Sequence, residues 1–284
     1  MIIKVISIIL ILVNVSVLGQ YKAAYTLFNS KGKKVSYAKM IKALNEKDVV
    51  LFGEYHDNPI VHWLQFEVTT ELDKTRDLIL AAEMFEADNQ DELDDYMLGI
   101  IDAEAFDTLT RLWMNYYTDY APLVEYAKEN KLKFVASNIP RRYANYVFKG
   151  GFSSLDVLTD LEKSWMAPLP IKYDSSLSGY AKMVEMMGGH GGFNLTKAQA
   201  IKDATMAHFI LKNHISGGLL LHFNGTYHSN FYEGILWYLK QEKPKFNYGT
   251  ISTVSQADVF NLEDEYKGQA DFIICVHQNM TSTH

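Results

Sequence analysis

The sequence contains almost no cysteine, and this excludes one route to stability. Cys275 is the only cysteine among 284 residues, so no disulfide can form within the chain. It lies in the apolar run 272–276, where we expect a buried, unpaired thiol. With 48% hydrophobic and 21% charged residues, the composition is that of an ordinary globular protein. Its stability must therefore come from the packing of a sizeable core.

An excess of positive charge is also lacking. The formal net charge of the chain is −7. Nucleic acids and anionic lipid surfaces attract proteins through clustered Lys and Arg side chains. We therefore expect neither a nucleic acid nor an anionic membrane surface to be the main partner. The sequence also shows no internal repeat and no low-complexity segment.

The first nineteen residues differ from the rest of the chain. Lys4 supplies one positive charge, residues 5–17 are almost wholly apolar, and residues 17–19 are typical of a small-residue cleavage site. This order predicts a secretory signal peptide over residues 1–19 and an exported mature chain of one domain over 20–284. The alternative is a retained membrane helix, because the apolar run approaches the length that spans a bilayer. No cysteine stands at the cleavage point, so a lipoprotein is not predicted.

Apolar runs alternate with amphipathic stretches along the mature chain. Strands are predicted at 49–52, 78–82, 133–136, 219–223, 248–254 and 271–276. Helices are predicted at 37–44, 59–72, 89–97, 103–112, 119–129, 178–187, 196–213 and 231–240, after a short lead-in from residue 20. Such alternation is typical of an α/β fold, with a mostly parallel central sheet flanked by helices on both faces. Residues around 140–215 are expected to form a helical insertion.

The segment 49–65 is central to the predicted site. Its apolar run is followed by Glu54 and His56, and alternate residues of extended chain point the same way, so these side chains can share one site. Asn58 suits the N-cap of the next helix, and Pro59 suits its first turn. The acid and the imidazole are thus expected at the carboxyl end of a strand, where α/β sheets bind ligands.

Polar residues follow each of the first four predicted strands. They are Glu54 and His56, then Glu83, then Asn138 and Arg141, and finally Asn224 and His228. A parallel sheet brings the carboxyl ends of its strands to one edge, so a single site is expected there. The simpler interpretation is that strand ends are generally polar, which makes each ending weak evidence when taken alone.

Four of these residues carry the predicted chemistry. Glu54, His56, Glu83 and His228 are the candidate catalytic residues and also the candidate ligands of a divalent metal. Imidazole and carboxylate groups with an open coordination position suit zinc or manganese and the activation of water. The alternative is a buried hydrogen-bonded network that holds the loops without metal or turnover. His62 is a candidate supporting residue or ligand, or else a satisfied surface or core histidine.

Five sequence elements between about residues 45 and 240 form a recognisable set. They are Gly53-Glu54-x-His56-Asp57-Asn58-Pro59-x-x-His62-x-x-Gln65, Glu83-Met84-Phe85, Asn138-x-Pro140-Arg141, Lys202-Asp203-Ala204-Thr205-Met206-Ala207 and Asn224-Gly-x-x-His228. Together they resemble the ChaN family of iron-regulated haem-binding proteins, which belongs to a wider group with the Tiki peptidases, the TraB/PrgY proteins and the erythromycin esterases.

The resemblance implies an α/β fold, export from the cytoplasm, and haem bound at a surface that can pair two subunits. It implies a role in iron and haem acquisition, in the periplasm or at the outer membrane. The implied partners are haem, a second copy of the chain and an outer-membrane haem receptor system. Two features depart from the family. Only His62 carries over where the family often has two adjacent histidines, and the lipobox cysteine is missing.

Haem needs an apolar slot, an axial ligand for its iron and cations for its propionates. Residues 173–193 supply tyrosine, methionine and histidine side chains beside several glycines, and Tyr180 and His190 are the predicted haem contacts. The same segment also fits an ordinary surface loop. Rival ligands are Tyr116, Tyr117 and Tyr120.

Asn138 and Arg141 are predicted to bind a propionate, because the planar guanidinium offers two donors to a carboxylate. The alternative is an Asn turn followed by a solvated arginine pair. The chain has no Cys-x-x-Cys-His motif, so haem would be bound reversibly and not covalently. His222 lies inside a predicted strand and is expected to be a core histidine.

The resemblance to the wider group also implies a rival function. This is a metal-dependent hydrolase, an esterase or a peptidase, with Glu54 or Glu83 as general base. A third option is a binding module that keeps the fold of its relatives without their activity. Haemin titration and metal analysis distinguish these alternatives.

Overall fold

The computed structural model describes residues 22–186 and 192–284. The side chains of residues 192 and 193 are not described. The predicted signal peptide and the predicted haem contact His190 therefore lie outside the described residues.

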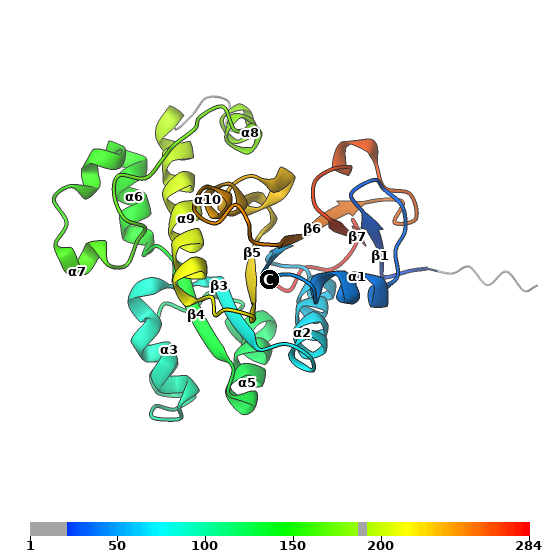
Figure 1. The fold of residues 1–284 in the computed structure, drawn as a ribbon, viewed down its shortest axis with the longest axis horizontal. Coiled ribbons are helices and arrows are strands. Elements are labelled where there is room, and N and C mark those ends of the chain that lie inside the picture. Colours follow the sequence, from blue (N-terminus) through cyan, green and yellow to red (C-terminus); the bar gives the residue numbers. More distant parts are fainter. Residues whose placement is uncertain (1–21, 187–191) are drawn as a thin grey trace, which may run out of the picture.

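A seven-stranded sheet forms the centre of the molecule (Figure 1). Its strands are β1 (Tyr25–Asn29), β2 (Val49–Glu54), β3 (Leu78–Glu86), β4 (Lys133–Asn138), β5 (Leu219–Gly225), β6 (Tyr248–Gln256) and β7 (Phe272–His277). Their spatial order is β1-β7-β6-β2-β5-β3-β4. All neighbours are parallel except β1 and β7, which are antiparallel. The predicted mostly parallel sheet is confirmed.

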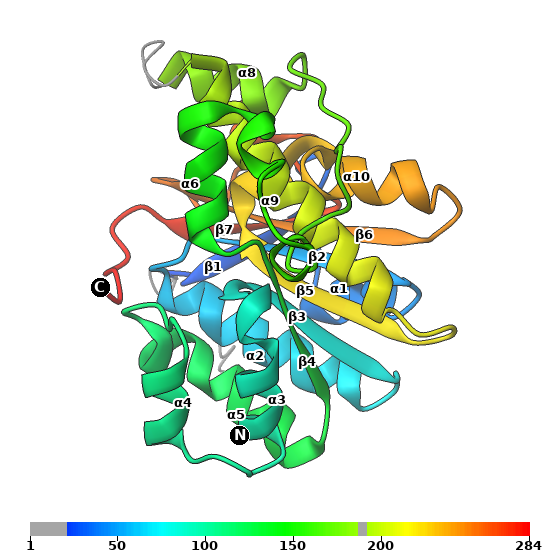
Figure 2. The ribbon, with the colours of Figure 1, turned by 90° about the vertical axis from the view of Figure 1, so that its left-hand side faces the viewer.

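Helices cover both faces of this sheet, as predicted (Figure 2). They are α1 (Tyr37–Leu44), α2 (Pro59–Asp73), α3 (Gln90–Met97), α4 (Ala103–Leu109), α5 (Ala121–Asn130), α6 (Arg141–Gly150), α7 (Asp160–Lys163), α8 (Ser178–Met186), α9 (Gly192–Asn213) and α10 (Ile235–Glu242). Helices α6 to α9 lie between β4 and β5, which confirms the helical insertion.

The alternation of side chains along each strand explains the two layers. In β2, Val50 and Phe52 belong to the core that includes residues of α1, α2 and α5. Val49 and Leu51 belong to the opposite core, with residues of α9 and α10. Because both faces are covered, β2 is buried along its whole length, which is why its sequence is a continuous apolar run.

The edge strand β1 was not predicted from the sequence. It covers Tyr25–Asn29 and pairs only with β7, nearly 250 residues further along the chain. Only two of its five residues are buried. A short, half-exposed segment has little sequence pattern of its own, so its extended conformation depends on a distant partner.

Local signals at the start of α2 agree with the structure. The Asn58 side chain accepts hydrogen bonds from the backbone N–H groups of Ile60 and Val61, at 3.1 and 3.2 Å. Pro59 occupies the first turn, as predicted. This cap fixes the helix directly after the loop that holds His56.

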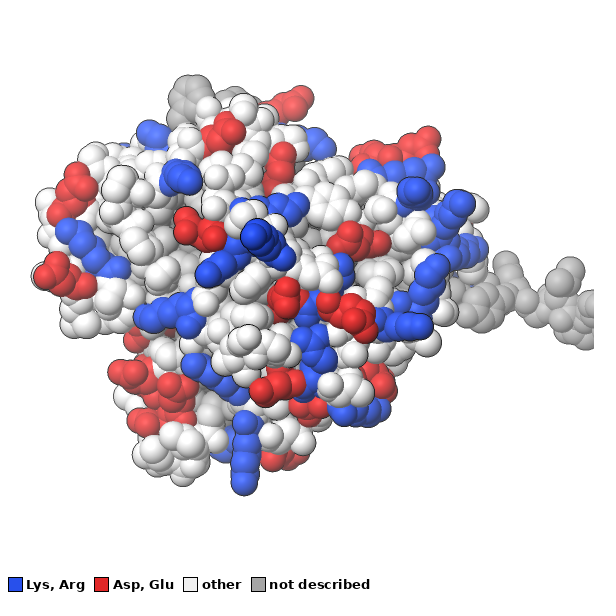
Figure 3. Space-filling view, in the orientation of Figure 1, with Lys and Arg blue, Asp and Glu red and all other residues white. Residues whose placement is uncertain are grey.

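None of the helices in the described part of the chain combines the length and apolar character that a bilayer-spanning helix needs. Charged side chains of both signs cover the face shown in Figure 3. Cys275 is buried and unpaired, as predicted.

Candidate functional site

Four of the predicted site residues meet at one edge of the sheet. Glu54 is the last residue of β2, His56 lies in the loop after it, and Glu83 lies within β3. His228 ends the 3-10 turn that follows β5. Strands β2, β5 and β3 are adjacent, so their carboxyl ends are neighbours in space. The structure brings the four side chains together, and their chemical role stays a prediction.

Glu54 and His56 form the first pair of the site. Nδ1 of His56 lies 2.7 Å from Oε1 of Glu54. The Tyr120 hydroxyl donates to the same oxygen at 2.8 Å, and the Gln65 amide donates to the other oxygen. Glu54 is buried, whereas 35% of the His56 side chain is exposed. The imidazole is therefore the part of this pair that a ligand can reach.

Two opposing effects act on the pKa of His56. Burial lowers it, but the hydrogen bond to Glu54 and the negative charges of Glu54 and Glu83 raise it by more. The net result is a pKa above the ordinary value for histidine. The pair thus favours a protonated imidazole whose Nδ1–H points at Glu54.

His228 stands between two buried carboxylates. Its Nε2 lies 3.1 Å from Oε1 of Glu83, and its Nδ1 is hydrogen-bonded to Asp203 of α9. Burial would lower the pKa of His228, but the charges of Glu83 and Asp203 outweigh it and raise the pKa to about 9. The charge of His228 in turn holds the pKa of the Glu83 carboxyl well below its usual range, against the effect of burial. At neutral pH this arrangement favours an imidazolium paired with the Glu83 carboxylate, while burial raises the pKa of Asp203.

The Glu54–His56 pair and the Glu83–His228 pair meet at Gly225. A Cβ atom on Gly225 would lie 2.6 Å from Nε2 of His56 and 3.5 Å from Oε2 of Glu83. The Gly225 N–H also donates to Oε2 of Glu83 at 2.7 Å. Glycine at this position therefore allows the imidazole of His56 to approach β5 and places it beside Glu83.

A second layer of hydrogen bonds fixes the loop after β2. The backbone carbonyl of His56 lies 3.0 Å from Nε2 of His62 and accepts a hydrogen bond from the Asn115 amide at 2.7 Å. Asn115 also donates to Asp119, which belongs to the π-helical turn Tyr116–Tyr120. Such turns are frequent near functional sites. His62 is buried and hydrogen-bonded, which fits both a supporting residue and a satisfied core histidine, so its role stays a prediction.

His222 is buried within β5, as predicted for a core histidine. Its ring nitrogens lie 2.9 Å from the Ser137 hydroxyl and 3.1 Å from Oδ1 of Asn224. Burial lowers its pKa to about 4, so the ring is neutral at physiological pH.

Asn138 and Arg141 have different surroundings in the structure. Asn138 is buried and donates to the backbone carbonyl of Glu83 at 3.0 Å. Its Oδ1 has no hydrogen-bond partner among the described residues. Arg141 is exposed at the start of α6. The predicted propionate-binding pair is therefore split between a buried amide beside the site and a solvated guanidinium.

A cleft opens next to His228, and we call it the Tyr227 cleft. It is lined by Tyr55, Gly179, Tyr180, Lys182, Met183, Met186, Gln199, Thr226, Tyr227, Asn230, Phe231, Glu233, Gly234, Glu265, Tyr266 and Gln269. Gln199 connects it to the site, because its amide nitrogen lies 2.9 Å from Nδ1 of His228. The cleft has a volume of about 160 Å³. This is below the range of about 300–1,000 Å³ that is usual for pockets enclosing small ligands.

Tyr180 lines this cleft, but its hydroxyl is not free. The side chain is buried, and the hydroxyl donates to Oδ2 of Asp203 at 2.9 Å. Burial and the charge of Asp203 raise the pKa of Tyr180, so a phenolate is strongly disfavoured. Tyr180 can form a wall for a ligand, whereas an axial bond to iron would require breaking its bond to Asp203.

The rival tyrosines lie elsewhere. Tyr116 and Tyr120 are buried, and the Tyr120 hydroxyl donates a hydrogen bond to Glu54. Tyr117 is 60% exposed and does not line the Tyr227 cleft. Tyr227 itself, which was not singled out from the sequence, is 58% exposed. Its position within the Asn224-Gly-x-x-His228 element was the available signal.

The metal prediction gains no support from this geometry. Among residues 22–186 and 192–284, no group of three or more His, Cys, Asp and Glu side chains is arranged to hold a metal ion. The predicted ligands are instead paired with one another and with Asp203 through hydrogen bonds.

Known proteins share this architecture. ChaN of Campylobacter jejuni, whose structure is described as cofacial haem binding, superposes with a TM-score of 0.66 at 18% identity, over 88% of this chain and 96% of that one. A protein from Bacillus cereus gives a TM-score of 0.52 at 11% identity, over 89% and 95% of the two chains. An erythromycin esterase in its open conformation gives 0.51 at 9% identity, over 91% and 99%. At these identities the likeness concerns the fold.

A curated relative is protein RETICULATA-RELATED 5 of the chloroplast of Arabidopsis thaliana. It is 24% identical over an alignment of 220 residues, and the match covers 72% of this chain. The match spans only 28% of the length of that relative. The family described as haem-binding uptake, Tiki superfamily, ChaN matches residues 40–239. This match includes all four residues of the Glu/His cluster, and the chain belongs to the ChaN family.

Proposed function

We propose that this chain is an exported haem-binding protein of iron and haem acquisition, and that haem binds in the Tyr227 cleft. The main support is the family match over residues 40–239. A cleft lined by aromatic and methionine side chains, next to His228, agrees with it. Export rests on the signal-like residues 1–19, and a haem receptor of the outer membrane is the proposed partner.

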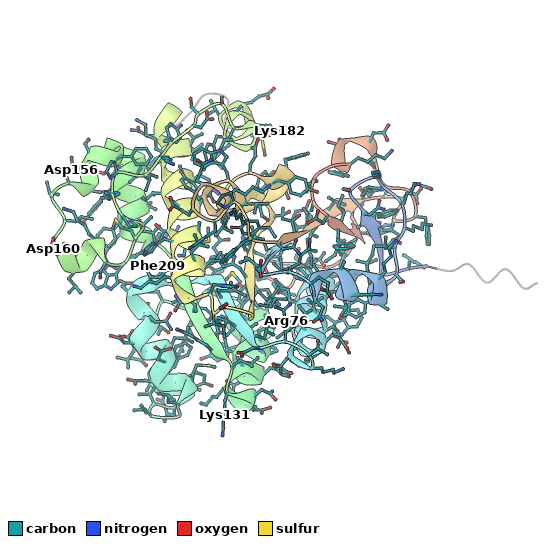
Figure 4. The ribbon with its side chains drawn as sticks, in the orientation of Figure 1. Arg76, Lys131, Asp156, Asp160, Lys182 and Phe209 are labelled. Atoms are coloured by element: carbon teal, nitrogen blue, oxygen red, sulfur yellow. The ribbon has the colours of Figure 1, made fainter. Side chains whose placement is uncertain are left out.

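The side chains of the cleft fit a haem. Tyrosine, phenylalanine and methionine side chains offer apolar surface to a planar ring. Lys182 is the cation among the lining residues, and its Nζ lies 4.6 Å from the centre of the Phe231 ring. Figure 4 places it at the outer end of the molecule, on α8, where a propionate would meet solvent. Haem, if bound here, would supply an iron centre at this edge of the sheet.

Tyr227 is the proposed axial ligand. Tyrosinate is one of the side chains that hold haem iron in proteins. Among the described residues the Tyr227 hydroxyl has one hydrogen-bond partner, the Met186 sulfur at 3.8 Å, so little has to be broken before it can bind iron. His190 lies outside the described residues and stays a predicted haem contact.

The small volume of the cleft supports a paired assembly. A space of about 160 Å³ is too small to enclose a ligand of the size of haem, so a haem bound there would keep a face exposed to water. A second loaded copy of the chain would bury that exposed face. We therefore propose a homodimer that forms when haem binds.

Haemin titration of the mature protein tests this function. We expect a saturable Soret shift with one haem per chain, and a doubling of mass in light scattering. Tyr227→Phe should abolish the tyrosinate signature, while Tyr117→Phe should not, because that residue is equally exposed but outside the cleft. Equal effects of the two substitutions, or no shift at micromolar haemin, would refute the proposed site.

A hydrolase is the second candidate function, and one observation favours it. His56 has its Nδ1 oriented by Glu54 while its ring is partly exposed, which is the arrangement of an acid–base group. The test is hydrolysis of ester and peptide panels by protein prepared without chelator, with its metal content measured. His56→Ala should abolish the turnover. His277→Ala, a histidine substitution at the end of β7, is the control and should retain it. Turnover that both variants keep would not come from this site.

A further inference from the structure

A second cavity lies between the helical insertion and α10, and we call it the lysine-rimmed cavity. It is formed by the segment after α7, by α9 and by α10, which lie side by side in both views (Figures 1 and 2). Its lining residues include Ile171, Lys172, Ala204, Ala207, Lys212 and Lys243. None of these lines the Tyr227 cleft. Its volume of about 650 Å³ is that of a small-molecule site.

The floor of this cavity is apolar because α9 presents small side chains there. Ala204 and Ala207 are buried, one turn apart on α9, and Leu211 follows one turn later. Ile171 faces them from the segment after α7. Small residues on one helix face leave room that no side chain of the described chain fills. An acyl chain or another apolar body would be in contact with carbon on several sides.

The rim has the opposite character. Lys172, Lys212 and Lys243 are exposed and take part in no ion pair in the described part of the chain. Glu242 is the one acidic side chain among the lining residues. In a chain of net charge −7, three such lysines around one opening are a local reversal of sign. Figure 3 shows Lys and Arg side chains over α9 and α10, near the middle of that face.

The other polar groups of the cavity would determine how an anionic ligand binds there. His208 stands between floor and rim, and burial together with the charge of Lys212 lowers its pKa, so the ring is neutral at pH 7. The Tyr238 hydroxyl donates to the carbonyl of Lys172 at 2.7 Å and thereby fixes one wall. A carboxylate at the opening would thus meet ammonium groups, with a neutral imidazole as an additional hydrogen-bond partner.

From this combination we infer that the lysine-rimmed cavity binds an amphipathic organic anion, with an apolar body on the α9 floor and a carboxylate at the lysine rim. The class is that of a medium-chain fatty acid. We expect this binding not to require haem, because the two sites share no lining residue. In Figure 4, Lys182, which lines the Tyr227 cleft, lies apart from Phe209, the neighbour of the cavity residue His208.

Displacement of dansylundecanoic acid by dodecanoate from the mature chain tests this inference. Lys212→Glu combined with Lys243→Glu should weaken dodecanoate binding by about tenfold or more. Lys245→Glu is the matched control, because Lys245 is an exposed lysine near Lys243 that does not line the cavity. Dodecanol should compete much less well than dodecanoate.

Two further variants distinguish loss of binding from loss of folding. Ala207→Met should fill the floor and reduce binding while the circular dichroism spectrum is retained, and Tyr227→Phe should leave dodecanoate binding unchanged. The inference is overturned if the lysine reversals act no more strongly than Lys245→Glu, if dodecanol competes as well as dodecanoate, or if Tyr227→Phe removes the binding. Haem binding can fail without affecting any of these results.

Discussion

The Nε2 atom of His228 lies 3.1 Å from a carboxylate oxygen of Glu83, and both side chains are buried. A buried ion pair of this kind depends on its protonation state, because removing the proton leaves a carboxylate without its counter-charge. Asp203 on the other side of the ring reinforces the protonated state. The stability of the fold should therefore depend on pH through this histidine.

The first prediction concerns that dependence. The folded-state pKa of about 9 is above the unfolded value of about 6.5, so the contribution of His228 is complete below pH 6.5 and is lost as pH rises to 9. It amounts to up to about 3 kcal/mol. Urea unfolding at pH 6 to 10 should show this loss, and His228→Gln should flatten it. A wild-type profile that stays level between pH 6.5 and 9 would contradict the assignment.

His222 provides the matched control, because its pKa is shifted in the other direction. The pKa of His222 in the folded state, about 4, lies below its value in the unfolded state, so the fold favours the neutral ring. His222 therefore lowers the stability of the fold only as pH falls below about 6.5. His222→Asn should leave the loss between pH 6.5 and 9 in place.

The second prediction concerns Gly225. A methyl group there would come within 2.6 Å of Nε2 of His56, so Gly225→Ala should displace the ring and destabilise the fold by roughly 1–3 kcal/mol. Gly249→Ala is the control, since its added methyl would meet mainly the flexible Lys47 side chain at 3.1 Å. Thermal unfolding and the His56 ring resonances report the two effects. Equal behaviour of the two variants would show that His56 does not pack against Gly225.

The third prediction concerns the pKa of His56. Replacing the carboxylate in Glu54→Gln removes the hydrogen bond and charge that raise this pKa, and leaves burial, which lowers it. The pKa measured by NMR titration should therefore fall. Glu265→Gln, which removes a surface carboxylate from the Tyr227 cleft, should leave it unchanged. An unchanged value in Glu54→Gln would mean that the pair does not form.

The fourth prediction concerns the helix that carries one wall of the cleft. The Glu233 carboxylate accepts the backbone N–H groups of Ser178 and Gly179, at 2.9 and 2.7 Å, at the start of α8. Glu233→Gln should weaken this charge-assisted cap by about 1 kcal/mol. Hydrogen exchange in α8 should become faster, and haemin affinity should decrease because Lys182 and Met183 lie on this helix.

Glu265→Gln serves as the control for this fourth prediction, because Glu265 lines the same cleft without capping a helix. If both variants exchange at the wild-type rate, the cap does not hold α8 in place.

The sequence predicted the central strands well because their signal is local. An apolar run such as 49–52 can be satisfied only by burial on both faces, and the structure places β2 in the middle of the sheet. The convergence of Glu54, Glu83 and His228 followed from parallel pairing alone. By contrast, β1 needed β7 as a partner, and no local pattern reports a partner so distant in the chain.

The details of the site were less predictable. Asp203 lies in the middle of α9, and only the packing of that helix on the sheet brings it to His228. The proposal of Tyr227 in place of Tyr180 depended on tertiary structure, because burial and the bond to Asp203 distinguish two tyrosines that look alike in sequence. Residue type indicated the expected chemistry, whereas exposure, which the sequence does not report, indicates which side chain is available for it.

The most direct test of the account is the position of iron in crystals grown with haemin. Anomalous scattering at the iron edge should give a peak in the Tyr227 cleft, within bonding distance of the Tyr227 hydroxyl oxygen. A peak bonded to another residue outside this cleft would contradict the proposed haem site, whatever the affinity measured in solution.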